Sequence, residues 1–481
     1  MVQHYRMAGY LGIDLGTSGL KLTMVASDGA IAAEAEASYD VVVPEPGWAE
    51  TDPAEWATAF DKARAQLSGL LSAAGRPRTE VAAVGVSGQM HGIVLVGRDA
   101  RPVRPGILWP DQRAVDILPD WVGLPAAVRA RLSNPLVAGM AGPLLSWLRR
   151  HEPASLAAAA LVTSPKDWLR GLLTGDSASE RTDASATLLW DVVADDWCAD
   201  ALDLAGISRA QLPTLVDSDF VVGTTRVLGS SRVEVPVVAG AADTAAALAA
   251  LKAAQPEDSC SGGIVVNLGT GIQILRPGAS ARSRSDPLTH LYADADGGWY
   301  EMLAIRNGGS TLSWVQRVLD VTWDELVALA RLAPPGSAGA VFVPFLTGER
   351  GGLAASTSAA AWSDLTPSVR RPELARSAFE ALAFTIRRGI ELLGSHHERI
   401  MLSGGGAREP WVRQLIADVI GRPVSYIPLR SASAVGAAVL AARGVGIQLP
   451  VQVTTIDEVP SVTDAPELGA AYARWHKAVG L

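Results

Sequence analysis

Residues 10–21 read YLGIDLGTSGLK, and this stretch decides the fold that we expect for the 481-residue chain. An apolar strand runs to Leu15, a turn of glycines and hydroxyl-bearing residues follows, and an alternating strand begins at Leu20. Asp28-Gly29 marks the next hairpin turn. The N-terminus is therefore predicted to be an antiparallel β-meander whose first turn is small enough to approach a phosphate.

A similar unit lies about half a chain away. Residues 13–17 read IDLGT and residues 266–270 read VNLGT, so Leu15 and Leu268 are 253 positions apart (268 minus 15). Each unit follows an apolar strand and precedes a glycine turn and a second apolar strand. Two interpretations stay open: a chance match of one short motif, or a duplicated domain in which each copy opens with such a hairpin.

Helices and strands alternate after the meander. Asp52 and Pro53 predict a helix start, because Asp suits the N-cap and Pro the first turn. Residues 81–86 predict a buried strand that runs into residues 87–92, SGQMHG. This alternation favours an α/β fold.

A second glycine-rich site follows the same logic. Residues 399–402 predict a strand, residues 403–407 (SGGGA) a loop, and residues 410–420 a helix that ends at Gly421. A strand, glycine loop and helix in this order direct backbone N–H groups toward an anion or a nucleotide.

Composition excludes several classes of protein. The chain has 41 Lys and Arg against 50 Asp and Glu, a net charge of −9, which argues against a surface for nucleic acid. With 48% hydrophobic residues it is a packed globular protein of two or three domains. No signal core and no apolar run of ~18 residues is found, so we expect a soluble cytoplasmic protein. Cys198 and Cys260 are expected to be buried free thiols.

Asp14 closes the first strand, directly before the glycine turn. Glycines allow close approach to phosphate oxygens, and the hydroxyls of Thr17 and Ser18 add donors. A carboxylate here could hold Mg²⁺. The alternative is an ordinary hairpin turn. The turn is neither a Walker A loop nor a Gly-x-Gly-x-x-Gly fingerprint, which disfavours P-loop and Rossmann folds.

Gln89, Met90 and His91 follow a predicted buried strand, where polar groups often line a crevice. A capped loop with a satisfied histidine is the alternative. We assign the remaining histidines no role, because their sequence contexts are typical of surfaces; they are His4, His151, His290, His396, His397 and His476.

Asp243 lies among alanines and glycines in residues 239–247, AGAADTAAA. A lone carboxylate in such surroundings either caps the helix or serves as a general base, since desolvation makes a carboxylate more basic. Three other features receive weaker predictions. Glu349-Arg350 predicts a structural salt bridge, Lys166 a structural helix-start residue, and Trp109 a tryptophan of the site.

Taken together, these segments resemble the FGGY family of carbohydrate kinases. The similar segments occur in the family's order over nearly the whole chain, at residues 10–21, 87–92, 164–175, 182–190, 267–271 and 403–407. Residues 164–175 (SPKDWLRGLLTG) and 182–190 (TDASATLLW) are similar to the family signature. Within the family, the QMH of residues 87–92 is similar to xylulokinases.

The resemblance implies an α/β protein of two actin/ribonuclease-H-like domains, residues 1–241 and 242–481, with ATP in the interdomain cleft. This also supports the duplication. Asp243 would be the base that accepts the proton of the sugar hydroxyl, and Asp14 would order Mg²⁺ and phosphate. The sugar pocket would be shaped by Gln89, Met90, His91 and Asp243, with Trp109 nearby. The residues toward ATP would be Thr17, Ser18, Gly269, Thr270, Gly271, Gly309, Gly405, Gly406 and Ala407.

Three segments depart from the family pattern. Gly351-Gly352 follow Gly-Glu-Arg where Thr-Pro-His or similar is usual, and residues 359–365 (AAAWSDL) replace Gly-x-x-x-Gly-Leu. Thr244 stands where Asn is common. These departures leave the phosphate motifs intact, and they bear on the acceptor sugar and on contacts between copies.

The leading hypothesis is an ATP-dependent kinase that phosphorylates the 5-hydroxyl of D-xylulose. A kinase for another ketopentose, a polyol or a sugar acid is the nearest alternative. A catalytically silent sugar or nucleotide sensor and an actin-like filament or chaperone ATPase are alternatives of other classes. Sugar, ATP and Mg²⁺ are the expected ligands, without nucleic acid or membrane partners, and the sequence leaves both a monomer and a homodimer open.

Overall fold

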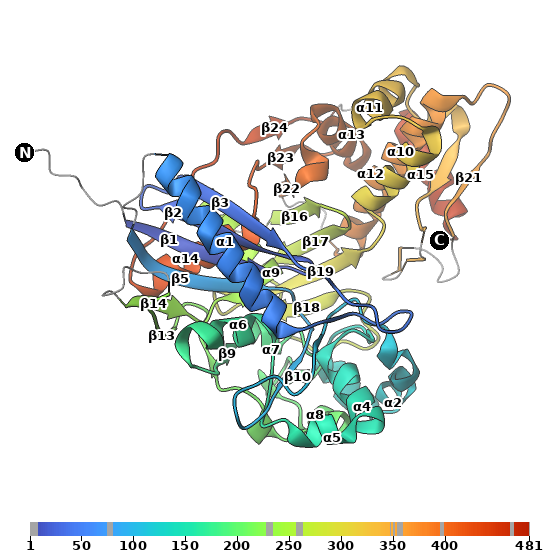
Figure 1. Cartoon of the computed structure of the whole chain (residues 1–481). Coiled ribbons are helices and arrows are strands. Elements are labelled where there is room, and N and C mark those ends of the chain that lie inside the picture. Colours follow the sequence, from blue (N-terminus) through green and yellow to red (C-terminus); the bar gives the residue numbers. More distant parts are fainter. Residues whose placement is uncertain are drawn as a thin grey trace, which may run out of the picture.

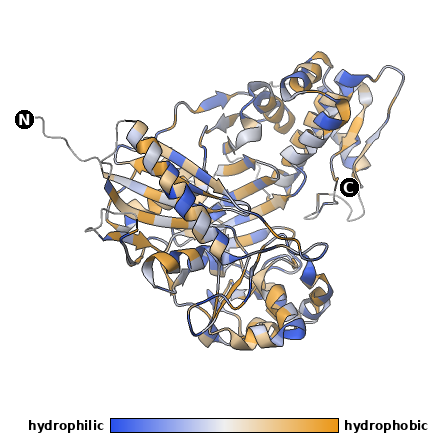
Figure 2. Ribbon diagram, in the orientation of Figure 1, coloured by the Kyte–Doolittle hydropathy of each residue, from blue (hydrophilic) through white to orange (hydrophobic). Residues whose placement is uncertain are grey.

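The computed structural model contains two mixed β-sheets, each covered by helices (Figure 1). The described residues are 8–74, 80–227, 234–255, 263–346, 348–349, 352–353, 359–394, 399–461 and 466–480. Hydrophobic residues run along the strands of both sheets (Figure 2). Within the described ranges, no helix is both long and apolar enough to cross a membrane. Cys198 is a buried free thiol, as predicted, and Cys260 lies outside the described residues.

The first sheet has the order β13-β14-β5-β1-β2-β3, and β15 also pairs with β5. Its strands are β1 (Ala8–Leu15), β2 (Gly19–Ala26), β3 (Ile31–Ser38), β5 (Glu80–Gly88), β13 (Val221–Thr225), β14 (Val235–Val238) and β15 (Ala241–Ala242). β1, β2 and β3 are antiparallel, which confirms the predicted meander, and β5 runs parallel to β1.

The second sheet has the order β18-β19-β17-β16-β22-β23-β24. Its strands are β16 (Gly263–Leu268), β17 (Ile272–Pro277), β18 (His290–Ala293), β19 (Trp299–Ile305), β22 (Arg399–Ser403), β23 (Val424–Tyr426) and β24 (Asp457–Val459). β16 pairs antiparallel with β17 and parallel with β22.

The two sheets share one topology. The series β3-β2-β1-β5-β14-β13 corresponds strand for strand to β19-β17-β16-β22-β23-β24, with the same directions of pairing. The two Leu-Gly-Thr units occupy equivalent hairpins, β1–β2 and β16–β17. A duplicated domain, rather than a chance match, therefore explains the repeat.

The helices flank the sheets, and short strands join the connecting segments. The helices are α1 (Pro53–Ala73), α2 (Leu118–Val122), α3 (Ala126–Leu132), α4 (Ala141–His151), α5 (Pro153–Ala158), α6 (Pro165–Thr174), α7 (Arg181–Ala184), α8 (Ala199–Ala205), α9 (Asp243–Ala253), α10 (Gly309–Leu319), α11 (Trp323–Leu332), α12 (Arg371–Leu392), α13 (Pro410–Ile420), α14 (Ala432–Gly444) and α15 (Pro466–Ala478). The short strands are β4 (Glu50–Thr51), β6 (Val94–Val96), β7 (Gly106–Ile107), β8 (Leu161–Thr163), β9 (Ser179–Glu180), β10 (Trp190–Asp191), β11 (Asp196–Trp197), β12 (Leu215–Val216), β20 (Val341–Val343) and β21 (Ala361–Ser363).

Local signals explain the helix ends. Asp52 Oδ1 accepts the N–H of Ala54 at 2.9 Å, so α1 is capped as predicted. α13 ends as predicted at Gly421, which has a φ of +71°. The segment of residues 359–365 that departs from the family pattern contains β21, which pairs with β20.

Helix α14 follows the second sheet in sequence but packs on the first sheet, beside α9 (Figure 1). A Cβ added to Gly12 of β1 would lie 1.7 Å from the carbonyl oxygen of Ala434, and one added to Gly85 of β5 would lie 2.0 Å from that of Ala437. Backbone therefore touches backbone here, and only glycine fits. The domain boundary expected between residues 241 and 242 falls within β15, directly before α9.

Candidate active site

Asp14 lies at the end of β1, next to β5 and β2. Its Oδ1 accepts a hydrogen bond of 3.4 Å from the Ser87 hydroxyl, and Lys21 is its register partner on β2. Burial, and next the negative charge of Asp243, raise the pKa of Asp14 to about 7, although Lys21 opposes this shift. Asp14 and Asp243 come from distant parts of the chain, and their carboxylates interact electrostatically.

Asp243 begins α9, directly after β15. The sequence suggested that it caps this helix, but Ala242 holds the cap position, because β15 extends through that residue. Asp243 Oδ1 accepts hydrogen bonds from the Thr244 N–H at 2.6 Å and from its hydroxyl at 3.1 Å. Burial raises the pKa of Asp243 to about 6.

Gln89 connects the end of β5 to the first glycine turn. Its backbone N–H donates to the Leu15 carbonyl at 2.9 Å, and its Nε2 donates to the Gly16 carbonyl at 3.2 Å. Its Oε1 is buried without a hydrogen-bond partner among the described residues. A buried acceptor of this kind is costly unless a ligand or water supplies the donor.

Met90 and His91 continue this loop. Met90 is buried, and His91 has the left-handed φ of +73° that few side chains adopt. His91 Nδ1 lies 2.6 Å from the Ala186 carbonyl oxygen. A carbonyl can only accept, so Nδ1 carries the proton and the orientation of the ring is set.

His290 contradicts our expectation of a surface histidine, because its side chain is buried on β18. Its Nδ1 lies 2.7 Å from the Tyr292 hydroxyl, and the two rings stack with centroids 5.1 Å apart. The His91 and His290 rings lie 6.5 Å apart. Histidine context alone could not reveal this pair, since 199 positions separate the two residues (290 minus 91); the neighbouring strand-forming LYA run was the available signal.

Trp109 contacts the first glycine turn. Its Nε1 donates to the Thr17 hydroxyl at 2.8 Å, while the residue stays 42% exposed. Ser18 is exposed on the same turn, and the Tyr39 hydroxyl donates to the Gly16 carbonyl. Trp109 and Thr17, both predicted site residues, are therefore in contact.

The second glycine turn is bound to the start of α10. The Gly269 carbonyl accepts the Gly309 N–H at 3.0 Å, and the Thr270 carbonyl accepts the Ser310 N–H at 3.0 Å. A Cβ on Gly309 would lie 2.6 Å from the Gly269 oxygen. Gly309 therefore lies beside residues 269–271.

Glu349 accepts hydrogen bonds from the segment directly before α10. Its Oε2 accepts the backbone N–H groups of Arg306 at 3.1 Å and Asn307 at 3.2 Å, and the Asn307 amide at 2.8 Å. Glu349 therefore orders the turn that leads into α10. The salt bridge predicted for it would involve Arg350, which lies outside the described residues.

The third glycine segment packs against the second turn. Gly404 has a φ of +87°, and its added Cβ would lie 2.4 Å from the Leu268 carbonyl oxygen. Gly405, Gly406 and Ala407 form a short 3₁₀ turn after it. Arg413 Nη1 donates to the Ala407 carbonyl at 2.9 Å and holds this turn in place.

A cavity of about 830 Å³ joins the two halves. Its lining includes Lys21, Glu36 and Asp243 on one side. On the other side it includes Asn267, Gln273, Ser403, Gly405, Arg408 and Arg430. Of the predicted site residues, Asp243 and Gly405 line it. Its basic residues Lys21, Arg408 and Arg430 were not predicted as site residues, because Lys21 ends the first motif without an assigned role and the two arginines lie outside the motifs. The size of the cavity suits a nucleotide-sized ligand.

The comparisons with known proteins agree with this geometry. Residues 9–250 match the N-terminal domain, and residues 264–445 the C-terminal domain, of the FGGY family of carbohydrate kinases. The chain is 30% identical to the xylulose kinase of Escherichia coli (strain K12), over 94% of this chain and 93% of that protein. Among solved structures, a xyloylose kinase from Brucella ovis is 28% identical with a TM-score of 0.85, covering 98% of each chain. The glycerol kinase of Plasmodium falciparum shares the fold, with a TM-score of 0.86 at 19% identity and 98% coverage of each chain.

Matched over both domains, and built from two sheets of one topology around a common cavity, the chain belongs to the FGGY family of carbohydrate kinases and is an ATP-dependent sugar kinase.

Proposed function

We propose that this kinase transfers the γ-phosphoryl group of ATP to the 5-hydroxyl of D-xylulose. The observation that carries this proposal is the arrangement of Gln89, Met90 and His91 at the end of β5, beside the β15 end from which Asp243 emerges. Those three residues are the segment that is similar to xylulokinases. The Escherichia coli relative named xylulose kinase supports the same acceptor.

Asp243 is the base in this proposal. The sugar hydroxyl oxygen attacks the γ-phosphorus, the bond from that phosphorus to the β–γ bridging oxygen breaks, and ADP leaves with those electrons. The hydroxyl proton passes to Asp243. A pKa of about 6 suits this role, because the carboxylate is ionised at neutral pH and is still more basic than an ordinary aspartate.

Asp14 is the residue proposed to hold Mg²⁺. Its carboxylate has the 3.4 Å contact to Ser87, and the repulsion from Asp243 that raises its pKa would be relieved by a cation. Mg²⁺ commonly takes one or two carboxylates together with phosphate oxygens and waters, so these residues fit the ion. When bound, the metal neutralises charge that develops on the phosphates.

The glycine turns are proposed to bind ATP. Thr17, Ser18 and residues 269–271 would contact the phosphates, while Gly309 and residues 405–407 would contact the nucleoside. Backbone N–H groups suit an acidic chain that has few lysines.

The acceptor site is proposed to lie between the two domains. Gln89 Oε1 is a buried acceptor that a sugar hydroxyl could satisfy. His91 is fixed by Ala186 on one side, and the stacked His290 and Tyr292 face it from β18. A pocket closed from both domains would keep water away from the phosphoryl group.

Two measurements test this proposal. ADP release is measured with D-xylulose and with a panel of other ketopentoses, polyols and sugar acids; D-xylulose should have the highest kcat/KM. Preference for another acceptor would overturn the xylulose assignment and leave the kinase activity in place. The Asp243→Asn variant should lose about 100- to 10,000-fold in kcat while it still binds ATP. Undiminished turnover of Asp243→Asn would remove the carboxylate from the role of base.

A further inference from the structure

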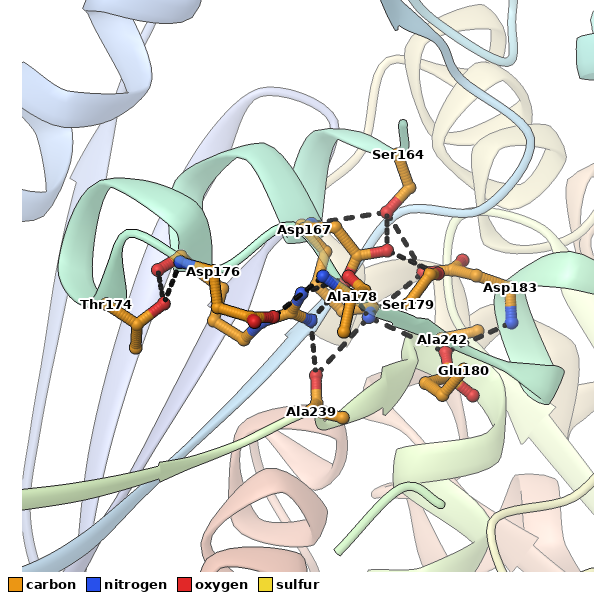
Figure 3. Close-up of polar contacts among 12 residues, drawn as sticks. Ser164, Asp167, Thr174, Asp176, Ala178, Ser179, Glu180, Asp183, Ala239 and Ala242 are labelled. Carbon is orange, nitrogen blue, oxygen red and sulfur yellow. Dashed lines mark hydrogen bonds and ion pairs between the residues drawn. The ribbon is translucent and has the colours of Figure 1, made fainter. Parts of the chain in front are cut away.

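A buried cluster of charged side chains lies beneath the site, on α6 and α7 and the strand between them (Figure 3). We call Lys166, Asp167, Arg170, Glu180 and Asp183 the signature cluster, because four of them come from the two signature segments and Glu180 lies two positions before the second segment. Each of these side chains is at most 6% exposed. Buried ion clusters are seldom more stabilising than an apolar core of the same volume, so this one calls for a functional reason.

Lys166 is the centre of the cluster. Its Nζ lies 2.6 Å from Asp167 Oδ1, 3.2 Å from Asp183 Oδ2 and 3.5 Å from Glu180 Oε1. Arg170 Nη1 pairs with the same oxygen of Asp167. Burial, followed by the charges of Glu180 and Asp167, raises the pKa of Asp183 to about 8. The positive charge of Lys166 opposes this shift.

The cluster is bonded to the backbone that leads to Asp243. Lys166 Nζ donates to the Ala239 carbonyl at 3.4 Å, and Arg170 Nη1 donates to the same carbonyl at 3.0 Å. The fully buried Thr182 Oγ1 accepts the N–H of Ala242 at 2.7 Å. Ala242 is the residue directly before Asp243, so this bond is one peptide unit away from the proposed base.

On its opposite side, the backbone of residues 239–242 packs closely against β5. Gly240 has a φ of +82°, and an added Cβ would lie 1.7 Å from the Val86 carbonyl oxygen on β5. At the end of β5, a Cβ on Gly88 would lie 3.0 Å from the Lys166 Cβ. The segment of residues 239–242 is thus enclosed between β5 and the signature cluster, and the strand end that carries Gln89 touches the same lysine.

We infer that the signature cluster positions the carboxylate of Asp243 through Thr182, whose backbone N–H donates to Glu180 Oε2 at 2.6 Å and whose Oγ1 accepts the N–H of Ala242. Thr182 is then a positioning residue, which acts on the backbone and not on the substrate. The inference rests on the proposed role of Asp243 as base. It assigns a task to Lys166, for which the sequence suggested only a structural role. A proton-accepting carboxylate must lie within hydrogen-bond reach of the sugar hydroxyl, and misplacement by about 1 Å can cost roughly 100-fold in rate.

Thr182→Val tests the inference, because valine keeps the shape of threonine and removes the acceptor for the Ala242 N–H. We expect kcat to fall about 10- to 100-fold while the KM for ATP stays within about twofold. Thr182→Ser retains the hydroxyl and should restore most of kcat. The matched control is Thr174→Val at the end of α6, where the lost hydroxyl accepts the N–H of Asp176 at 3.1 Å. This control should leave kcat unchanged.

The inference is overturned if Thr182→Val retains wild-type kcat, if Thr174→Val lowers kcat equally, or if Thr182→Ser is as slow as Thr182→Val. If the valine variant does not fold, Thr182→Cys replaces it, since the sulfur of cysteine is a much weaker hydrogen-bond acceptor than the oxygen of serine. Cysteine should then be slower than serine, and equal rates overturn the inference. An inactive Asp243→Asn with an unaffected Thr182→Val rejects the inference alone, whereas an active Asp243→Asn rejects the proposed base itself.

Discussion

The two halves of the molecule place different chemistry on one scaffold. In the first sheet, Asp14 at the end of β1 faces Lys21 across the hairpin and Ser87 on the parallel strand. At the equivalent places in the second sheet are Asn267, Gln273 and Ser403. Asn267 Nδ2 donates to Gln273 Oε1 at 3.2 Å, and its Oδ1 accepts from Ser403 at 3.5 Å.

The charged pair of the first half is thus a neutral amide pair in the second. The serine on the parallel strand is common to both halves. A carboxylate suits a half that holds a cation and lies near the base, while an uncharged amide suits a half that receives a polyanionic nucleotide. On the roles proposed above, the first half would place the reacting groups, and the second half would supply most of the residues that bind ATP.

The largest effect is expected when the first half is made like the second. Asp14→Asn copies the Asn267 side chain and should lower kcat by about 100- to 1000-fold, because a group that orders phosphate and metal is lost. Steady-state ADP release at saturating sugar and ATP measures the change. Higher Mg²⁺ concentrations should recover part of the activity. A kcat within threefold of wild type would mean that the charge difference between the halves has no catalytic meaning.

Asp14 and Asp243 together should make the reaction sensitive to pH. Both carboxylates must be ionised, and their pKa values are raised to about 7 for Asp14 and about 6 for Asp243. The kcat/KM for the sugar should therefore decline below pH 7 and fall about tenfold or more per pH unit below pH 6. In Asp14→Asn the decline should begin only near pH 6. A flat profile from pH 5 to pH 8 would contradict both assignments.

The reverse exchange, in which the second half is made like the first, should weaken the binding of ATP. Asn267→Asp places a negative charge in the nucleotide half and should raise the KM for ATP by about tenfold, which corresponds to about 1.4 kcal/mol of repulsion. The change in kcat should be smaller. Asn267→Ala, which removes the bond to Gln273 without adding charge, is the control and should change this KM by less than about threefold. Equal effects of both variants would show that charge is not the cause.

The smallest effect concerns stability. Asp14 has a folded-state pKa above the ordinary value, so its ionisation disfavours the folded state: the penalty is absent near pH 4 and fully present above about pH 7. Asp14→Asn should therefore raise the free energy of unfolding at pH 8 by at least about 1 kcal/mol, with little gain near pH 4. Asn267→Asp should have the opposite sign at pH 8. Urea unfolding at the two pH values checks both, and a loss of stability in Asp14→Asn at pH 8 would contradict the cause given for its pKa.

Local signals predicted much of the fold and part of the site. The meander, the helix after Asp52 and the strand, glycine loop and helix around Gly404 follow from periodicity and capping within short windows. The same windows predicted a glycine turn at residues 14–19 and the loop at residues 89–91. These features depend on neighbours in the chain, which is why one sequence is enough to find them.

Other features depend on packing between distant segments. The proximity of His91 and His290, the return of α14 to the first sheet, and the contact of Lys166 with the Ala239 carbonyl have no local signature. A histidine in a surface-like context was buried because β18, the edge strand of the second sheet, packs against α7. The helix cap predicted at Asp243 moved by one residue because the pairing of β15 with β5 extends through Ala242.

By itself, the sequence predicted an α/β fold, showed that the Leu-Gly-Thr motif recurs at residues 268–270, and indicated which residues are candidates to hold phosphate or accept a proton. Backbone conformation and residue type settle these questions within a few positions. Only the tertiary structure decided which of those residues line the same cavity. It also decided that Asp14 and Asp243 lie close enough for the charge of Asp243 to raise the pKa of Asp14. Such coupling depends on distance and burial, which arise only when segments more than two hundred residues apart pack together.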